Sequence, residues 1–503
     1  MIHRDSHCAS GMVCQQRVAD EFVPGCVGIE GYSSGDFCVD IKDVDYWQSF
    51  ENEGSHTPWK TRCMQQLIVS AGEYHSTSTV EMSGEERASE TAPSNSTEPY
   101  KALVYFYLAG GLDSYNMLAP YDCAPIDVHQ RYMEIRGESE IATGVGLPKN
   151  RLIPINITDS DPTQPPQPCS SFGVHSSLTK LAELYNSGHL NFFANAGLMA
   201  EPVNTDNYRD ETPVQLFAHN AMTLEAKRED LFDEFSGTGV GGRMATILTK
   251  RGIPTNLFSI DGQQVLLSGQ PGEGGPTQFT LSSQGLSSFN ANPSISNMDQ
   301  VIKSLNNDTT AESGFYAETF SAKLSESLYK QQQLKTEIDQ TVVTTTFPGG
   351  STSDEFEMIT RIMQTREARG SVRDIFFAQD GGYDTHSQVD ASLLNNFARI
   401  NGVISAFVEE LEVLGLWEST VVVQFSEFAR TLDPNSNDGS DHAWGGQHFM
   451  FGGAVDGGKV FGKYPTDFQQ GDAAKLALSR GRMIPTTPWD AVSCFINIFV
   501  LCI

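Results

Sequence analysis

Three apolar segments of this chain end in a similar way, and that shared ending constrains the fold more than any other feature. The segments are LVYFYLAGGLDSYN (103–116), FFAQDGGYDTHSQ (376–388) and VVVQFSEFAR (421–430). Short runs rich in β-branched and aromatic residues are typical of buried strands. Each run is followed by an acid: Asp113, Asp384 and Glu427. Because ligands bind at the carboxyl ends of strands in an open α/β sheet, the three acids mark a candidate ligand-binding edge.

Strand and helix patterns alternate along the rest of residues 99–503. Leucines at helical spacing follow His175 and stop at Gly188, and the apolar run 189–197 comes next. A helix pattern at 389–415 separates apolar runs at 372–379 and 419–425. This alternation predicts a mostly parallel sheet covered by helices. The segment 452–465, with Asp456-Gly457-Gly458 at its centre, predicts a β-hairpin.

Histidines join the acids at the ends of these runs. His386 follows Asp384 by two residues, and Asp441 and His442 are adjacent in GSDHAWGG. Carboxylates and imidazoles together bind divalent metals, with zinc or manganese favoured over magnesium or calcium. Six ligands are enough for two metals about 4 Å apart, which suit phosphoryl-type displacements. The predicted metal ligands are Asp113, Asp384, His386, Glu427, Asp441 and His442.

Two further side chains are candidates for substrate contact. Arg430 follows Glu427 by three residues. Its guanidinium could bind a substrate oxyanion through two hydrogen bonds, or it could pair with a nearby acid. His219 stands beside Asn220 in LFAHNAM and could line the same pocket. The sequence does not decide between the two roles of Arg430, or whether His219 lies in the pocket.

The charge of the chain limits its partners. The formal net charge is −30 among 503 residues, which argues against binding to nucleic acid. An anionic small-molecule ester remains compatible, because a bound dication reverses the local potential. The longest apolar stretch, 491–503, is shorter than the roughly 20 residues that span a bilayer, so no transmembrane segment is expected. The oligomeric state stays open.

Residues 1–98 form a different kind of segment. They are irregular, carry five of the nine cysteines (Cys8, Cys14, Cys26, Cys38 and Cys63), and end in a polar stretch that reads as a linker. The cysteine spacing suits a small disulfide-stapled region of a secreted or extracellular glycoprotein. Three N-x-S/T sequons, at Asn95, Asn156 and Asn307, agree with a secretory route, although no signal peptide is visible.

Seven segments also resemble a known family. They are GGLDSYN, FANAGLMAEP, QLFAHNAM, GGYDTHSQ, FSEFART, GSDHAWGGQHFMFGGAVDGGKVFGKYP and RGRMIP. In this order they resemble the sulfatase-like family called domain of unknown function 1501, which is grouped with the alkaline phosphatase and sulfatase superfamily. The resemblance implies an alkaline phosphatase-like three-layer α/β/α sandwich over residues 99–503. It also implies metal-binding roles for Asp113, Asp384, His386, Glu427 and His442, and its pattern continues past the point where this chain stops, so truncation at the C-terminus is expected.

One departure from the family pattern bears on the reaction. Superfamily hydrolases place a Ser, Thr or modified Cys nucleophile before a helix. The corresponding position here is Ala218. Either the nucleophile is another residue, with Ser114 and Thr205 as candidates, or a water held by the metal attacks, or the protein is not catalytic.

Three functional hypotheses follow. The leading one is metal-dependent hydrolysis of a phosphate or sulfate ester. The alternative is a non-catalytic secreted or surface protein that keeps the fold. A third is an adhesion protein whose activity lies in residues 1–98.

Overall fold

The computed structural model describes most of the chain from residue 98 onward. The described residues are 98–137, 144–157, 166–212, 214–231, 237–283, 285, 298–306, 315–469 and 475–493, with the strand backbones at 2–3, 12–16 and 36–40. The chain divides into two compact units, Met1–Glu90 with Ser288–Lys330 and Thr91–Ser287 with Gln331–Ile503. The domain boundary near residue 98 stays a prediction.

The first unit contains a small antiparallel sheet of β1 (Ile2–His3), β2 (Met12–Gln16) and β3 (Asp36–Asp40). It also contains α7 (Met298–Leu305) and the start of α8 (Phe315–Ile338). Ile302 and Leu328 pack together between these two helices. The five cysteine side chains for which disulfides are expected lie outside the described residues.

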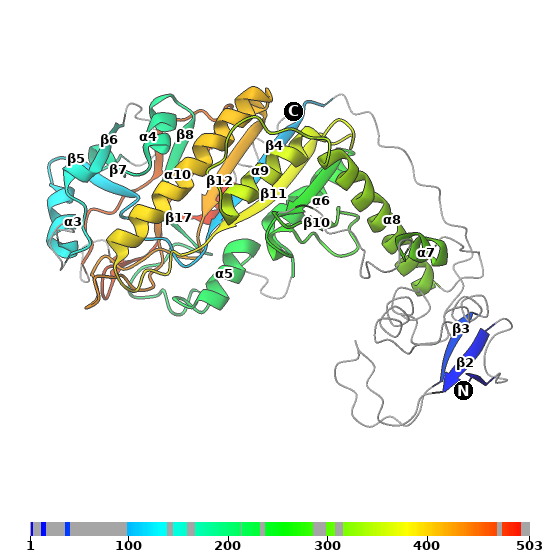
Figure 1. The fold of residues 1–503 in the computed structure, drawn as a ribbon. Helices are drawn as coiled ribbons and strands as arrows, with labels where there is room; N and C mark the ends of the chain where they lie inside the picture. Colours follow the sequence, from blue (N-terminus) through cyan, green and yellow to red (C-terminus); the bar gives the residue numbers. More distant parts are fainter. Residues whose placement is uncertain are drawn as a thin grey trace. The chain divides into compact units, whose positions relative to one another are not determined.

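The second unit is built on a nine-stranded sheet (Figure 1). Its order is β10 (Gln278–Thr280), β9 (Thr255–Ser259), β11 (Arg373–Asp380), β4 (Lys101–Leu108), β12 (Thr420–Phe425), β13 (Gly446–Gly452), β8 (Leu190–Gly197) and β14 (Lys459–Gly462), and β17 (Thr487–Pro488) also pairs with β8. Among these described strands, only β13 is antiparallel to its neighbours. The predicted mostly parallel sheet is confirmed, and β11, β4 and β12 are adjacent at its centre.

Helices cover both faces of this sheet. Successive residues of β4 alternate between two hydrophobic cores, so that Val104 and Phe106 face one and Tyr105 faces the other. The first core is closed by α4 (Thr179–Asn186), α9 (Ser351–Gln364) and α10 (Val389–Val413), and the second by α5 (His219–Arg228) and α6 (Val240–Lys250). Burial on both faces explains the unbroken apolar runs of the central strands. The predicted three-layer α/β/α sandwich is confirmed.

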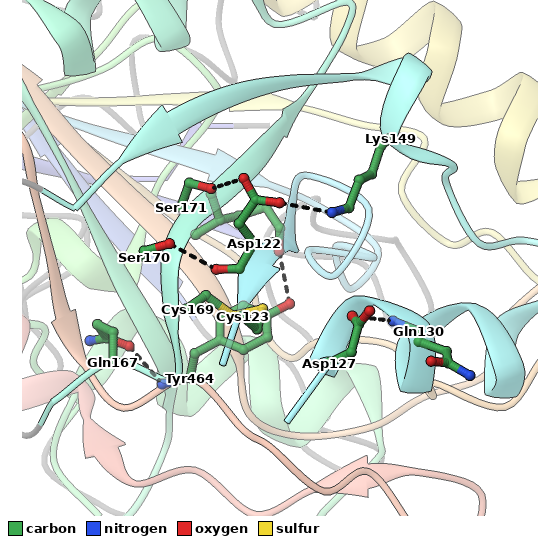
Figure 2. The surroundings of a disulfide bond; sticks show 11 residues. Asp122, Cys123, Asp127, Gln130, Lys149, Gln167, Cys169, Ser170, Ser171 and Tyr464 are labelled. Carbon is green, nitrogen blue, oxygen red and sulfur yellow. Dashed lines mark hydrogen bonds and ion pairs between the residues drawn. A yellow bond between two sulfur atoms is a disulfide. The ribbon is translucent and has the colours of Figure 1, made fainter. Parts of the chain in front are cut away.

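A second, three-stranded antiparallel sheet has the order β5 (Leu118–Cys123), β7 (Cys169–His175), β6 (Leu152–Asn156), and α3 (Val128–Arg136) follows β5. A disulfide joins Cys123 to Cys169, which face each other across β5 and β7. Figure 2 shows it beside Asp122, which is bonded to Lys149 and Ser171. A disulfide suits an oxidising compartment, which stays a prediction.

Short elements complete the second unit. They are η2 (Lys149–Arg151), η3 (Val265–Leu267), η4 (Trp417–Ser419), β15 (Ala477–Leu478) and β16 (Arg482–Met483). Within the described segments, no helix is long and apolar enough to cross a membrane.

The hairpin predicted for residues 452–465 is wrong. β13 and β14 do not pair with each other, because β8 lies between them. The connection crosses the start of β8, where Gly457 N donates to Gly188 O at 2.9 Å. A Cβ at Gly457 would lie 2.5 Å from Leu190 N. The glycine therefore allows close approach to another backbone rather than a hairpin turn.

Candidate metal centre

The carboxyl ends of the three central strands meet at one edge of the sheet. In the parallel registers, Asp380 of β11 is opposite Leu108 of β4, and Phe425 of β12 is opposite Tyr107. The loops that follow these strands therefore start at the same level. Gly110, in the loop after β4, has a φ of +122°, and a Cβ there would lie 2.3 Å from Asp384 N. The Gly-Gly sequence thus lets two of the loops touch.

One carboxylate oxygen lies at the centre of the site. Asp384 Oδ1 is 3.5 Å from His219 Nε2, 3.1 Å from His386 Nε2 and 3.4 Å from His442 Nε2. His386 Nε2 and His442 Nε2 are themselves 2.9 Å apart. Potential ligand atoms of His219, Asp384 and His442 all lie within 4.8 Å of one another. Three imidazole nitrogens and one carboxylate oxygen are a donor set that suits zinc.

All three imidazoles are held through their other nitrogen. The Nδ1 contacts are His219 to Glu427 Oε1 at 2.9 Å, His386 to Asp441 Oδ1 at 2.8 Å, and His442 to Phe217 O at 2.8 Å. Carboxylate and carbonyl oxygens only accept hydrogen bonds, so each Nδ1 carries the hydrogen. In the neutral rings each Nε2 is then the unprotonated nitrogen, the form in which an imidazole binds a metal. Metal-binding histidines are oriented in this way.

Glu427 is buried behind His219. Its Oε2 accepts a hydrogen bond from Tyr107 Oη at 2.8 Å, and its Oε1 accepts one from Gly110 N at 2.9 Å. Ser426 Oγ lies 3.1 Å from Oε2. The structure brings Glu427 to the cluster, where its Oε1 contacts His219 Nδ1.

Asp441 contacts the Nδ1 atom of His386, as Glu427 contacts that of His219. Its carboxylate contacts His386, Arg480 and Asn435. Partial burial opposes ionisation, but hydrogen bonds from His386, Asn435 and Arg480 outweigh it and lower the pKa of Asp441 to about 2. Asp441 is therefore a carboxylate at neutral pH.

Charges near Asp384 and His442 also act on their protonation. Burial raises the pKa of Asp384, but the bonded Arg430 guanidinium outweighs burial and the net shift is downward. Burial lowers the pKa of His442, and the positive charge of Arg430 adds to this effect. Both shifts favour the protonation states that bind a metal, an ionised carboxylate and a neutral imidazole.

Arg430 is fully buried and pairs with an acid, which is one of its two predicted roles. Its Nη2 donates to Asp384 Oδ1 and, at 2.5 Å, to Gly110 O. Its Nε donates to Gly111 O at 2.9 Å, and its Nη1 to Ser440 O at 2.9 Å. The guanidinium ties the loops after β4 and β11 together, and its three nitrogens are all engaged within the protein.

A family model described as "Protein of unknown function (DUF1501)" matches residues 100–477, most of the chain. The chain belongs to the DUF1501 family. The resemblance found in the sequence is thereby confirmed. Among curated proteins, no sequence matches this chain.

Solved structures with a likeness to this DUF1501 chain are distant. The C-terminal periplasmic domain of EcEptC from Escherichia coli, in complex with Zn, is 8% identical, with 75% of this chain and 79% of that chain covered and a TM-score of 0.31. The lipoteichoic acid synthase LtaP from Listeria monocytogenes is 9% identical, with 77% and 76% covered and a TM-score of 0.28. The alkaline phosphatase from the Antarctic bacterium TAB5 is 9% identical, with 73% and 95% covered and a TM-score of 0.28.

Asp113 of this DUF1501 chain is placed apart from the histidines. Its side chain is fully buried, and its Oδ2 accepts hydrogen bonds from Arg136 Nη2 at 2.5 Å and Ser440 Oγ at 3.0 Å. Within the described residues, no contact joins Asp113 to the three histidines. Of the six predicted ligands, the structure brings together Asp384, His386, Glu427, Asp441 and His442.

The two nucleophile candidates, Ser114 and Thr205, lie away from the cluster around Asp384. Ser114 is buried, and its Oγ accepts a hydrogen bond from Gln447 N at 2.8 Å. Thr205 belongs to a loop that is bonded through its backbone to Lys475 O at 2.9 Å. Across the described part of the chain, neither side chain contacts the cluster around Asp384.

The start of α5 brings His219 into the DUF1501 site. Phe217 has a φ of +64°, which is unusual for a bulky residue, and this conformation accompanies the contact of its carbonyl with His442. Strain of this kind concentrates at functional sites. Ala218 is the N-cap and makes no side-chain hydrogen bond.

Arg480 and Arg482 are basic residues at the centre that no sequence pattern had indicated. Arg482 Nε donates to His442 O at 2.7 Å, and its guanidinium lies 5.1 Å from the centre of the Phe217 ring. Both arginines fall in RGRMIP, which served only to identify the family. Two basic residues in a strongly acidic chain were the signal that could have found them.

Proposed function

We propose that this DUF1501 protein is a metal-dependent hydrolase of phosphate or sulfate esters. His219, Asp384, His386 and His442 would hold the metal, and zinc or manganese suits three nitrogens and one oxygen best. The observation that supports this most is the convergence of three imidazole Nε2 atoms on Asp384 Oδ1. Glu427 and Asp441 would orient the histidines rather than bind the metal themselves.

A bound dication would supply Lewis-acid charge to the ester oxygen and to an attacking water. The chain's own residues would prepare that position. Glu427 and Asp441 keep two imidazoles in the required tautomer, and Arg430 fixes the carboxylate of Asp384. The methyl group of Ala218 offers no nucleophile at the start of α5, so water is the proposed attacking group.

Arg482 would contact the anionic part of the substrate. Its side chain is half-buried beside His442, and within the described residues it forms no ion pair with a carboxylate. The neighbouring Arg480 is paired with Asp441. A guanidinium at the edge of the centre gives local positive potential in a chain of net charge −30, which favours a small anionic ester over nucleic acid.

Metal content and an ester panel test this function together. Purified wild type, Asp384→Asn and the exposed control Asp456→Asn would be assayed on aryl phosphate mono- and diesters and aryl sulfates, with and without chelator. We expect turnover that chelator removes, retained in the control and lost with the metal in Asp384→Asn. A folded wild-type protein that binds no zinc or manganese would refute the proposal.

The non-catalytic hypothesis keeps one observation in its favour, the alanine at position 218. A metal-loaded protein that hydrolyses no ester in the panel would support it.

Glycosylation is part of the hypothesis that this protein is secreted. Asn156, at the exposed end of β6, is the described sequon at which a glycosidase-sensitive mass shift would be sought.

A further inference from the structure

We infer that the centre binds a single divalent cation, and that the guanidinium groups of Arg136 and Arg430 supply the positive charge that a second cation would bring. The inference rests on the proposed metal-dependent function and narrows it. It departs from the two-metal site expected from six ligands. The contacts of Asp113 and Asp384 carry it.

The carboxylate of Asp113 is already neutralised by a protein cation. Arg136 Nη2 lies 2.5 Å from Asp113 Oδ2, and both side chains have 0% exposure. Arg136 is the last residue of α3, and its Nη1 also donates to Thr431 O at 3.3 Å. Arg136 therefore balances the charge of Asp113, although it is bonded to Oδ2 alone and Asp113 Oδ1 is buried without a hydrogen-bond partner among the described residues.

Asp384 has a guanidinium of its own. Arg430 Nη2 is bonded to the same Oδ1 atom around which the three imidazoles gather. Ser440 links the two ion pairs, because its Oγ donates to Asp113 Oδ2 at 3.0 Å and its carbonyl accepts from Arg430 Nη1 at 2.9 Å. Two acid–guanidinium pairs thus flank one serine, and only the Asp384 pair reaches the histidines.

The charge balance around the centre suits one dication. Four carboxylates, those of Asp113, Asp384, Glu427 and Asp441, face three bonded guanidiniums, those of Arg136, Arg430 and Arg480. With neutral imidazoles, the set carries one net negative charge. One dication makes it singly positive, which attracts an anionic ester, whereas two would leave three uncompensated positive charges at close range.

A nearby lysine adds further positive charge beside the centre, which also disfavours a second dication. Lys227 Nζ lies 4.6 Å from the centre of the Tyr107 ring, and Tyr107 is bonded to Glu427. The number of donor atoms also suits a single cation. His219, Asp384 and His442 offer ligand atoms within 4.8 Å of one another, and His386 Nε2 lies 2.9 Å from His442 Nε2, so these four residues offer donors to one tetrahedral ion.

Metal counting tests the inference. Wild type, Asp113→Asn and Asp384→Asn would be loaded with zinc, desalted and measured by elemental mass spectrometry. We expect about one equivalent in wild type and in Asp113→Asn, and less than about a tenth of an equivalent in Asp384→Asn, because only the latter loses a ligand. Because Asp113→Asn leaves Arg136 unpaired, the double variant Asp113→Asn/Arg136→Gln is measured beside it.

Manganese-loaded wild type gives a second readout by electron paramagnetic resonance. We expect the spectrum of isolated Mn²⁺. Two zinc equivalents in wild type, with one lost when Asp113 is replaced, or a spin-coupled manganese pair, would overturn the inference while leaving the proposed hydrolase intact. A folded wild type that binds no metal would instead overturn the metal centre itself, and the inference with it.

Discussion

The carboxylate of Glu427 meets the imidazole of His219 at 2.9 Å, although 208 positions separate them in the sequence. Glu427 follows β12 and His219 begins α5, so the contact joins the edge of the sheet to a helix on one of its faces. Tyr107 and Gly110 hold the carboxylate from the other side. A buried acid in this position fixes which imidazole nitrogen faces Asp384.

Replacing Glu427 with Gln tests this role. The variant keeps the shape of the side chain but removes its charge, and zinc affinity should fall about 10- to 100-fold, as for other groups that orient metal-binding histidines. Competition titration against a zinc indicator measures the change. Glu418→Gln, at an exposed acid of η4, is the matched control. Equal affinity in both variants would contradict the role.

Arg482→Gln should weaken substrate binding without removing the metal. Loss of one hydrogen bond to a charged group costs about 1.5–3 kcal/mol, so KM for an anionic ester should rise roughly 10- to 100-fold. Steady-state kinetics and zinc content would be compared with Arg209→Gln, which removes an exposed guanidinium bonded to Tyr208. A similar rise in both variants would mean that only the overall charge matters.

Gly110→Ala should disrupt the centre. A Cβ at Gly110 would meet Asp384 N at 2.3 Å, whereas one at Gly252 would meet nothing within 4 Å, and both glycines have positive φ. The clash should cost about 1–3 kcal/mol beyond the backbone strain that the two variants share. Thermal unfolding and zinc content would be measured for both. Full zinc occupancy in Gly110→Ala would show that the loops tolerate the added atom.

Acid should destabilise the protein partly through His448. Burial lowers the pKa of His448 to about 3, and its ring packs on Trp489. Between that value and the ordinary pKa of about 6.5, the unfolded chain binds a proton that the folded chain does not. Stability from this group is therefore complete above pH 6.5 and falls on acidification, by about 1.4 kcal/mol per pH unit.

Urea unfolding of wild type and His448→Phe from pH 7.5 down to pH 4 would measure this effect. The variant should lose less stability across the interval, because it has no group to protonate at that position. Parallel pH profiles would show that other groups set the acid sensitivity. The difference between the proteins at pH 7.5 isolates the change in packing.

Local patterns predicted much of the fold and several residues of the centre. The apolar runs that became β4, β11 and β12 were recognisable because strands buried on both faces need unbroken apolar sequences. Asp384 and His386 were recognisable because they lie in the loop that follows β11. The hairpin at 452–465 was mispredicted, because a glycine-rich turn looks the same whether the next strand pairs with the last one or crosses a third.

The sequence by itself determined the three-layer architecture and the family, because composition, periodicity and motif order are local properties of the chain. Tertiary structure alone decided that Glu427 lies behind His219, that Arg136 neutralises Asp113, and that Arg430 is bonded to Asp384. These pairings join residues from different strands, helices and loops. Which distant groups meet depends on the packing of the whole sheet, and no local pattern contains that information.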